Sequence, residues 1–273
     1  MFSTSPNKLA HLQQRLSGLG PCLVALSAGV DSTFLLKVAV DVLGRDAVLA
    51  VTARSASLAS EEAVAAEELA RLIGARHRVI DTNELENPDY RANRGDRCYF
   101  CKRTLFTAMR GIAQELGARH LLYGAIVDDL SDDRPGHRAA QEFEVLSSLQ
   151  EAGLTKVEIR ELSRELGLPT WNKPQLACLS SRIPRGDEVT VEKLRVVESA
   201  EHIVRLAGFH QVRVRHHGAV ARIEVEPQDI SRLQQLLANG RLVSELHALG
   251  FHDVVCDPHG YRTAAAIVQP TTL

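Results

Sequence analysis

The chain has almost no excess of charge of either sign. Lysine and arginine together number 32 against 34 aspartate and glutamate residues, which gives a formal net charge of -2 over 273 residues. Proteins held on nucleic acids or anionic membranes by their overall charge carry a clear basic excess. The balance therefore predicts no overall attraction to either partner and leaves room only for local basic patches.

Long apolar runs are absent as well. No stretch reaches the roughly 18 consecutive apolar residues that a membrane-spanning helix needs. The N-terminal segment lacks the apolar core of a signal peptide. We therefore expect a cytoplasmic protein without a membrane span, and the length is enough for one large or two modest domains.

Cysteine is scarce, with five residues in the whole chain. Five unevenly spread cysteines do not make a disulfide scaffold, so metal binding or catalysis is the better interpretation. Cys98 and Cys101 form a C-x-x-C at the start of a predicted helix, and Cys178 stands alone in an irregular segment. Cys22 and Cys256 fall in predicted strands and are expected to be packing residues.

The three remaining cysteines leave several interpretations open. A structural zinc site would need a fourth ligand, for which His77 or another cysteine is available. A redox C-x-x-C would follow the first strand of a thioredoxin-like unit, whereas this motif follows a loop, so the redox interpretation is disfavoured. Three thiolates on a [4Fe–4S] cluster would leave one iron open for a substrate or an extra sulfide. From the residues alone, zinc and the cluster are equally favoured.

The clearest motif lies between Cys22 and Lys37, where the pattern predicts a buried strand, a tight turn and a helix. The turn is Ser27-Ala28-Gly29-Val30-Asp31-Ser32, and its small residues allow the backbone to approach a ligand closely. The amide groups at a helix N-terminus bind anions. No G-x-x-x-x-G-K-[ST] pattern occurs, so transfer of a γ-phosphate is not implied.

The first part of the chain alternates strands with helices. Strands are predicted at 22–26, 47–52, 77–81 and 120–124, with helices between them and a polar loop at 83–97. This alternation predicts an α/β fold with a doubly wound parallel sheet. Ligands of such sheets bind at the carboxyl ends of the strands, where Ser27 and Gly124 are expected.

The later part has a different pattern. A capping box at 155–158 opens a helix, and residues 171–186 are irregular. Beyond them come a helix, two alternating strands at 211–215 and 221–225, a helical stretch broken near Asn239-Gly240, and a last strand. We predict an ATP-binding domain over 1–185 and a smaller α+β domain over 186–273.

Several charged residues are candidates for ligand contact. Lys102 follows the C-x-x-C and could contact a phosphate as a point charge, or simply be solvated. Arg213 and Arg215 alternate with valines and so share one face of a strand, where they suit a phosphate or carboxylate. Arg182 is a weaker candidate of the same kind. Asp128 and Asp132 are candidate Mg²⁺ ligands or loop caps.

Five segments together resemble the LarE family of ATP-dependent sulfur transferases, and the resemblance spans roughly residues 10 to 260. The family helps to build the nickel-pincer nucleotide cofactor, and its first segment is a pyrophosphate (PP) loop shared with other ATP pyrophosphatases. The segments are SAGVDS at 27–32, RCYFCK at 97–102, GAIVDDLSDDRPG at 124–136, KPQLACLSSRIPRG at 173–186 and VRVRHHG at 212–218.

The resemblance implies that ATP adenylates a carboxylate of a pyridinium biscarboxylic acid mononucleotide and that sulfur then displaces AMP. It implies nucleotide or substrate contacts from nine residues and Mg²⁺ at the leaving pyrophosphate. Lys102, Asp31 and Cys178 are the implied catalytic residues. The nine are Ser27, Ala28, Gly29, Asp31, Ser32, Thr52, Gly124, Arg213 and Arg215.

Family members supply sulfur in two ways. Some sacrifice the sulfur of one cysteine at the position of Cys178, and others carry three cysteines on a [4Fe–4S] cluster that delivers sulfide. This chain has the triplet Cys98, Cys101 and Cys178 and so resembles the second kind. The resemblance also implies a homo-hexamer and a sulfide or sulfur-donor protein as partner.

Three other functions compete with this one. A tRNA thiolase would share the PP-loop but needs a basic surface for the phosphate backbone. An amide synthetase would share the loop but leave the cysteine triplet without a role. A non-catalytic nucleotide-binding protein with a structural zinc is the third. We expect a small-molecule nucleotide carboxylate as substrate, with neither nucleic acid nor membrane as a partner.

Overall fold

The structure is a computed structural model that describes residues 5–131, 135–174 and 177–262. The chain divides into two compact units, Met1–Leu176 and Ala177–Leu273, and the segment that carries Cys178 therefore belongs to the second unit. Within the described residues, no helix is both long enough and apolar enough to cross a membrane.

The first unit is built on a parallel sheet of four strands, which confirms the predicted α/β class. The strands lie in the order β3-β2-β1-β4, which places the strand of the PP-loop, β1, between two others. Such a strand is covered on both faces and therefore reads as an apolar run. The strands are β1 (Cys22–Ala25), β2 (Val48–Arg54), β3 (Arg76–Asp81) and β4 (His120–Leu122).

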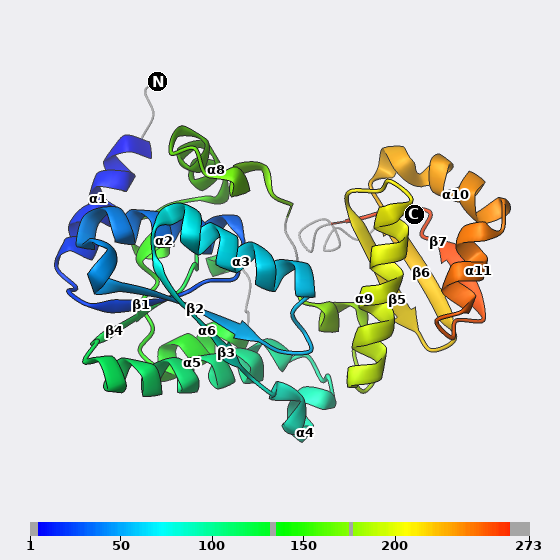
Figure 1. Ribbon diagram of the computed structural model, residues 1–273, viewed down its shortest axis with the longest axis horizontal. Helices are drawn as coiled ribbons and strands as arrows, with labels where there is room; N and C mark the ends of the chain where they lie inside the picture. The colour runs from blue at the N-terminus through cyan, green and yellow to red at the C-terminus, as the bar shows by residue number, and fades with distance from the viewer. Residues whose placement is uncertain (1–4, 132–134, 175–176, 263–273) are drawn as a thin grey trace. The chain divides into compact units, whose positions relative to one another are not determined.

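Helices cover both faces of this sheet (Figure 1). On one face lie α1 (Ser5–Ser17), α2 (Val30–Leu43), α3 (Ser60–Ile73) and α8 (Lys156–Glu165). On the other lie α5 (Arg97–Leu116) and α6 (Pro135–Glu142). Cys22 and Val24 of β1 pack into the first layer and Leu23 into the second, as the alternation of a strand requires.

Short elements complete this unit. The predicted loop at 83–97 was partly wrong, because it contains η2 (Glu84–Glu86) and α4 (Pro88–Arg91). The reason is packing: Leu85 and Tyr90 are buried, and the Tyr90 hydroxyl hydrogen-bonds that of Ser57. The other short elements are η1 (Arg45–Ala47), η3 (Val127–Ser131), α7 (Ser148–Glu151) and η4 (Pro169–Asn172).

The second unit is a three-stranded sheet with helices packed against it. Strands β5 and β6 are antiparallel, and β7 lies parallel to β6 because the helical connection between them returns the chain to the end of the sheet where β6 begins. That connection breaks at Gly240, whose φ of 78° ends one helix and precedes the next. The elements are η5 (Leu179–Arg182), α9 (Val191–Leu206), β5 (Val212–His217), β6 (Val220–Val225), η6 (Pro227–Asp229), α10 (Ile230–Ala238), α11 (Arg241–His247) and β7 (Asp253–Cys256).

A buried ion pair holds the start of this unit together. Arg182 donates to Glu201 through Nε at 2.7 Å, and the two side chains are 3% and 2% exposed. Glu201 also accepts a hydrogen bond from the backbone N–H of Val214. The carboxylate thus joins η5, α9 and β5, and its loss would leave a buried guanidinium without its counter-charge.

We predict that Glu201→Leu destabilises the protein by about 3–5 kcal/mol, the range for removing one partner of a buried pair. Urea denaturation followed by circular dichroism measures this change. Glu245→Leu is the matched control, since Glu245 pairs with Arg241 on the surface, where the side chains are 45% and 90% exposed. Its expected change is under about 0.5 kcal/mol, and equal effects of the two variants would contradict the role of Glu201.

Candidate functional site

The PP-loop connects the end of β1 to the start of α2. Ala28 is fully buried with a φ of 56°, a left-handed conformation that costs a residue with a Cβ about 1–2 kcal/mol. Gly29 follows as the N-cap and has no side chain that could cover the first amides of α2. The turn therefore presents a helix N-terminus at the carboxyl edge of the sheet, which is an arrangement that binds anions.

Hydrogen bonds inside the loop fix its shape. The Ser32 hydroxyl accepts from the backbone N–H of Ser27 at 3.2 Å and lies 3.1 Å from the Ser27 hydroxyl. It also donates to the carbonyl of Gly29 at 3.3 Å. Ser32 is buried whereas Ser27 is exposed. Ser32 therefore supports the turn, and Ser27 is the hydroxyl that is open to a ligand.

Gly124, just beyond β4, packs directly against this loop. A Cβ at position 124 would lie 2.9 Å from the backbone nitrogen of Ser32 and 3.1 Å from the carbonyl carbon of Asp31. Only glycine allows so close an approach. The predicted meeting of Ser27–Ser32 and Gly124 at one edge of the sheet is what the structure has.

Asp31 forms an ion pair with Lys156, the first residue of α8. The predicted capping box at Thr155 and Glu158 is present, and the Asp128 carboxylate accepts from the backbone N–H of Lys156 at 2.9 Å. Burial raises the pKa of Asp31, and the Lys156 ammonium opposes that rise. Within the described residues, Oδ1 of Asp31 is buried without a hydrogen-bond partner.

Asp128 thus serves as a cap for α8. Asp132, the other candidate ligand of Mg²⁺, lies outside the described residues. Oδ1 of Asp31, which has no hydrogen-bond partner among the described residues, is the better candidate cation ligand, because hard cations bind carboxylate oxygens.

A second lysine supports the loop from the segment after α8. Lys173 donates to the carbonyl of Ala28 at 3.1 Å and pairs with the Glu62 carboxylate at 2.7 Å. Its side chain is 19% exposed. Lys173 therefore stabilises the strained peptide of Ala28 and adds positive charge beside the loop.

Thr52 also supports the loop. Its hydroxyl donates to the carbonyl of Leu26 at 2.8 Å and lies 2.9 Å from Nε2 of His77. Since the single hydroxyl proton goes to Leu26, Nε2 of His77 carries the proton that Thr52 accepts. Burial lowers the pKa of His77, while Glu67 opposes that shift.

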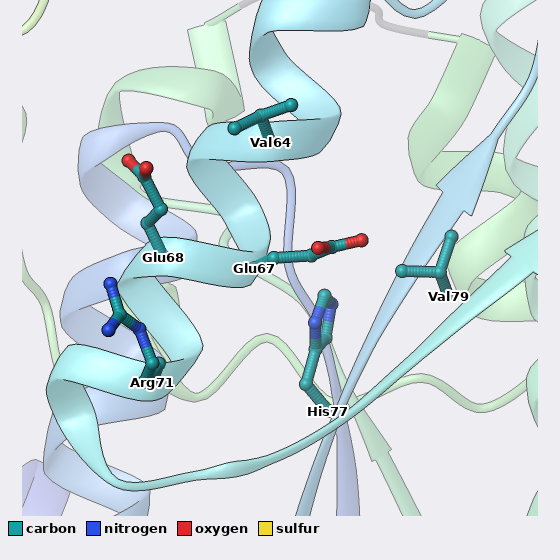
Figure 2. A pocket seen from close by; sticks show the side chains of 6 residues that line it. All are labelled: Val64, Glu67, Glu68, Arg71, His77 and Val79. Carbon is teal, nitrogen blue, oxygen red and sulfur yellow. The ribbon is translucent and has the colours of Figure 1, made fainter.

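His77 also lines a shallow cavity of about 530 Å³ between α3 and β3. Figure 2 shows Glu67 reaching toward the imidazole, with Val79 beside it and Glu68 turned away. No group of three or more histidine, cysteine or acidic side chains gathers for metal binding in the part of the chain that the structure describes. Neither His77 nor the cysteines Cys98, Cys101 and Cys178 belong to such a group among these residues.

Cys98 and Cys101 lie in the first turn of α5, in the first unit. Cys98 is exposed and Cys101 half-buried, and their spacing of three residues places both on one side of the helix. Lys102 follows on the same turn, with its ammonium 4.6 Å from the centre of the Tyr123 ring. The turn therefore carries two accessible thiols and a positioned cation.

Cys178 lies in the second unit, exposed and directly before η5. Arg182 donates to its carbonyl at 3.0 Å and is otherwise occupied by Glu201, so this weaker candidate for ligand binding is a support of the cysteine segment. Arg215 donates to the carbonyl of Ser181 and, through two nitrogens, to both oxygens of Glu224.

Arg213 is the more buried of the two predicted arginines, at 8% exposure. Its guanidinium lies 4.5 Å from the Tyr261 ring centre and donates to the Tyr261 hydroxyl at 3.1 Å. Burial lowers its pKa, and the neighbouring Arg182 and Arg215 add to that effect. Three guanidiniums thus gather within the second unit beside the segment of Cys178.

The two remaining cysteines are unsuited to thiolate chemistry. Burial raises the pKa of Cys22 to about 12 and also raises that of Cys256, where Asp257 adds to the rise. Cys22 is buried inside β1. Both match their expected role in packing.

Sequence reasoning missed Lys156, Lys173 and the pair of Glu201 with Arg182. Lys156 could have been found, because the predicted capping box places it at the first position of a helix. Lys173 and Glu201 carried no such signal, since their partners are 145 and 19 residues away in the chain.

No protein-family model matches the chain. The chain is 38% identical to a pyridinium-3,5-bisthiocarboxylic acid mononucleotide synthase of Lactiplantibacillus plantarum, over 96% of this chain and 94% of that protein. An uncharacterized protein of Synechocystis is 46% identical over 94% of this chain and 96% of its own length. The tRNA-specific 2-thiouridylase MnmA of Xanthobacter autotrophicus is 31% identical over 72% of this chain but only 60% of its own length.

We predict that Lys156→Met shifts the acid limb of the pH profile for AMP formation to higher pH. Removing the ammonium removes the effect that opposes burial, so the pKa of Asp31 rises further. A protonated carboxylate binds a cation poorly, so we expect AMP formation to depend on ionised Asp31. The rate of AMP release, measured from ATP between acid and neutral pH, tests this shift.

Lys37→Met is the control for that experiment, because Lys37 pairs with Asp41 farther along α2. Its acid limb should match that of the unchanged protein. The same substitution also changes how stability depends on pH. A raised pKa of Asp31 in the folded state favours folding below the usual aspartate pKa, and this stabilisation is lost as pH rises through the folded-state pKa. An unshifted profile in Lys156→Met would refute the coupling to Asp31.

Proposed function

The chain belongs to the LarE family of ATP-dependent sulfur transferases, and from this membership we propose that it thiolates a carboxylate of pyridinium-3,5-biscarboxylic acid mononucleotide. The observation that carries the proposal is the similarity to the synthase over nearly the full length of both chains. The PP-loop is shared with the more distant tRNA thiouridylases, which places the enzyme among the PP-loop sulfur transferases. We likewise propose that the substrate is this nucleotide and that the product serves the assembly of the nickel-pincer cofactor.

The first half of the proposed reaction is adenylation. A carboxylate oxygen of the substrate attacks the α-phosphorus of ATP, and the bond to the oxygen that bridges to the β-phosphorus breaks. The charged product that leaves is pyrophosphate. Ser27, Gly29 and the amides at the start of α2 would hold its oxygens, and the unpartnered, buried Oδ1 of Asp31 suits a Mg²⁺ ion that neutralises them.

Three lysines support this step in the proposal. Lys102 would contact phosphate or adenylate oxygens, as expected from the sequence. Lys156 limits the protonation of Asp31, and Lys173 holds the Ala28 peptide. Developing negative charge in a partly buried site is stabilised most by cations that are already in place.

The second unit would recognise the acceptor. Arg213 and Arg215 are the proposed ligands of its phosphate and carboxylate groups. Arg215 is held by Glu224, and Arg213 by the Tyr261 ring. A guanidinium fixed in this way loses little conformational freedom when it binds a planar or tetrahedral anion.

The second half of the reaction replaces AMP by sulfur. We propose Cys98, Cys101 and Cys178 as ligands of a [4Fe–4S] cluster, because Cys98 and Cys178 are exposed, Cys101 is partly exposed, and thiolates are the donors that iron–sulfur clusters bind. When bound, such a cluster would supply sulfide for the exchange. The sulfide attacks the acyl carbon, the bond to the AMP oxygen breaks, and a thiocarboxylate and AMP result.

A sacrificial route is the main alternative within the same family. There Cys178 Sγ itself attacks the acyl adenylate, AMP leaves, and the thioester then loses the proton at Cα as the Cβ–Sγ bond breaks. The products are the thiocarboxylate and dehydroalanine at position 178. In both routes Cys178 is essential, but only the cluster route requires Cys98 and Cys101.

The partners of the enzyme are proposals as well. We expect free sulfide or a sulfur-donor protein to replenish the sulfur and a homo-hexamer as the assembled form. The similarity to MnmA keeps a tRNA thiolase as the second candidate. A slightly acidic chain with a net charge of -2 disfavours it, because tRNA binding draws on a basic surface.

The deciding experiment is an anaerobic assay with ATP, Mg²⁺, sulfide and the nucleotide carboxylate, after reconstitution with iron and sulfide. We expect repeated turnover, with one AMP released for each oxygen replaced by sulfur in the product mass. Cys98→Ala, Cys101→Ala and Cys178→Ala should each reduce thiolation to background and remove the visible iron–sulfur absorption. Cys256→Ala should retain both, because Cys256 has a raised pKa and an expected packing role.

The other outcomes separate the alternatives. A single turnover that needs Cys178 alone, with the protein lighter by the mass of one H₂S, would establish the sacrificial route and exclude the cluster. Zinc without iron–sulfur absorption would count against the cluster in the same way. Thiolation of tRNA but not of the nucleotide carboxylate would replace the proposed function by the second candidate.

A further inference from the structure

Lys102 is in contact with two residues that have no role in the proposal above, Gly136 and Tyr123. Its methylenes pass over Gly136 of α6, where an added Cβ would lie 2.8 Å from Cδ and 3.0 Å from both Cε and Nζ. Its ammonium lies 4.6 Å from the centre of the Tyr123 ring. An aromatic face at this distance attracts a cation. The side chain is thus fixed along its whole length.

The Tyr123 ring is itself clamped. It follows β4 and is only 6% exposed. The ring of Phe106 meets it edge-on at 5.8 Å, and the imidazole of His137 does so at 6.3 Å. The Tyr123 hydroxyl lies 3.1 Å from Nδ1 of His137. The ring therefore offers the ammonium a surface of fixed orientation.

The same region braces the turn that carries the C-x-x-C. Tyr99, between Cys98 and Cys101, donates its hydroxyl to Glu142 of α6 at 2.7 Å. The guanidinium of Arg138, also on α6, lies 4.8 Å from the centre of the Tyr99 ring. The start of α5 and α6 are thus joined by the contacts of Tyr99 as well as by that of Lys102 with Gly136.

We propose that Gly136, Tyr123 and His137 form a seat that positions the Lys102 ammonium for its contact with the ATP or adenylate phosphate. A free lysine loses its rotamer freedom when it binds a ligand, whereas a seated one has lost it already. Tyr123, His137 and Gly136 are positioning residues, because they act through Lys102. This inference rests on the proposed role of Lys102 in catalysis.

Gly136→Ala is the sharpest variant, because it fills the space under Lys102 and leaves every charge in place. Its φ is not in the left-handed region, and alanine favours a helix more than glycine does, so α6 is not weakened. Gly111→Ala is the matched control: this glycine lies in α5 itself, where an added Cβ meets nothing within 4 Å. Tyr123→Phe keeps the ring without the hydroxyl, and Tyr123→Leu removes the ring.

Two measurements on the full-length protein test the seat. The first is the rate at which an amine-reactive reagent labels Lys102 at neutral pH, read by peptide mass. In Gly136→Ala and Tyr123→Leu, Lys102 should be labelled about 3- to 10-fold faster than in the unchanged protein. The second is AMP formation, in which both variants should raise KM for ATP by about tenfold, while Gly111→Ala matches the unchanged protein. Tyr123→Phe should lie between, because it keeps the cation–π contact.

The outcomes distinguish the two proposals. If Lys102→Ala leaves AMP formation unchanged, the proposed role of Lys102 fails, and the labelling rates still report on the seat. If Lys102→Ala removes activity but Gly136→Ala labels and turns over like Gly111→Ala, the seat is refuted. Should Tyr123→Leu fail to fold by circular dichroism, the comparison of Gly136→Ala with Gly111→Ala decides alone.

Discussion

The contact between Gly124 and the peptide that joins Asp31 to Ser32 is the constraint on which the first unit depends. A Cβ at position 124 would come within 2.9 Å of the Ser32 nitrogen, so the end of β4 and the start of α2 meet backbone to backbone. This contact fixes where the loop lies relative to Tyr123, the preceding residue. The proposed phosphate site and the proposed seat of Lys102 therefore depend on consecutive residues at the end of one strand.

Charge in the first unit is arranged around a loop that has little charge of its own. Asp31 is the only ionisable residue of Ser27–Ser32, and it is paired with Lys156, while Lys173 pairs with Glu62 and reaches the loop carbonyl of Ala28. Each lysine is thus held by a carboxylate before any phosphate arrives. Fixed cations stabilise developing charge without having to reorganise, and their partners keep them from repelling one another.

Much of this arrangement could be predicted from the sequence, and the reasons for success and failure are physical. Buried parallel strands read as apolar runs, and a turn such as Ser27–Ser32 has a local pattern, so the sheet, the loop and the meeting with Gly124 were accessible. The capping box at Thr155 was also local. Contacts such as that of Lys173 with Ala28 depend on tertiary packing across 145 residues and leave no periodic signal. The buried Tyr90 was hidden for a related reason: its polar, proline-containing surroundings read as a loop, although packing turns them into α4.

The arginines of the second unit show why residue type alone does not assign a role. Arg182, Arg213 and Arg215 lie close together in one unit, and all three looked like anion ligands in the sequence. Arg182 binds the buried Glu201 and the backbone of the Cys178 segment, whereas Arg213 faces an aromatic ring and Arg215 pairs with the buried carboxylate of Glu224. A guanidinium that already neutralises a buried charge cannot be withdrawn without a large cost. Of the three, Arg213 is the one whose guanidinium faces an aromatic ring, and Tyr261 holds it in a fixed orientation, which is what we propose for contact with an anionic ligand.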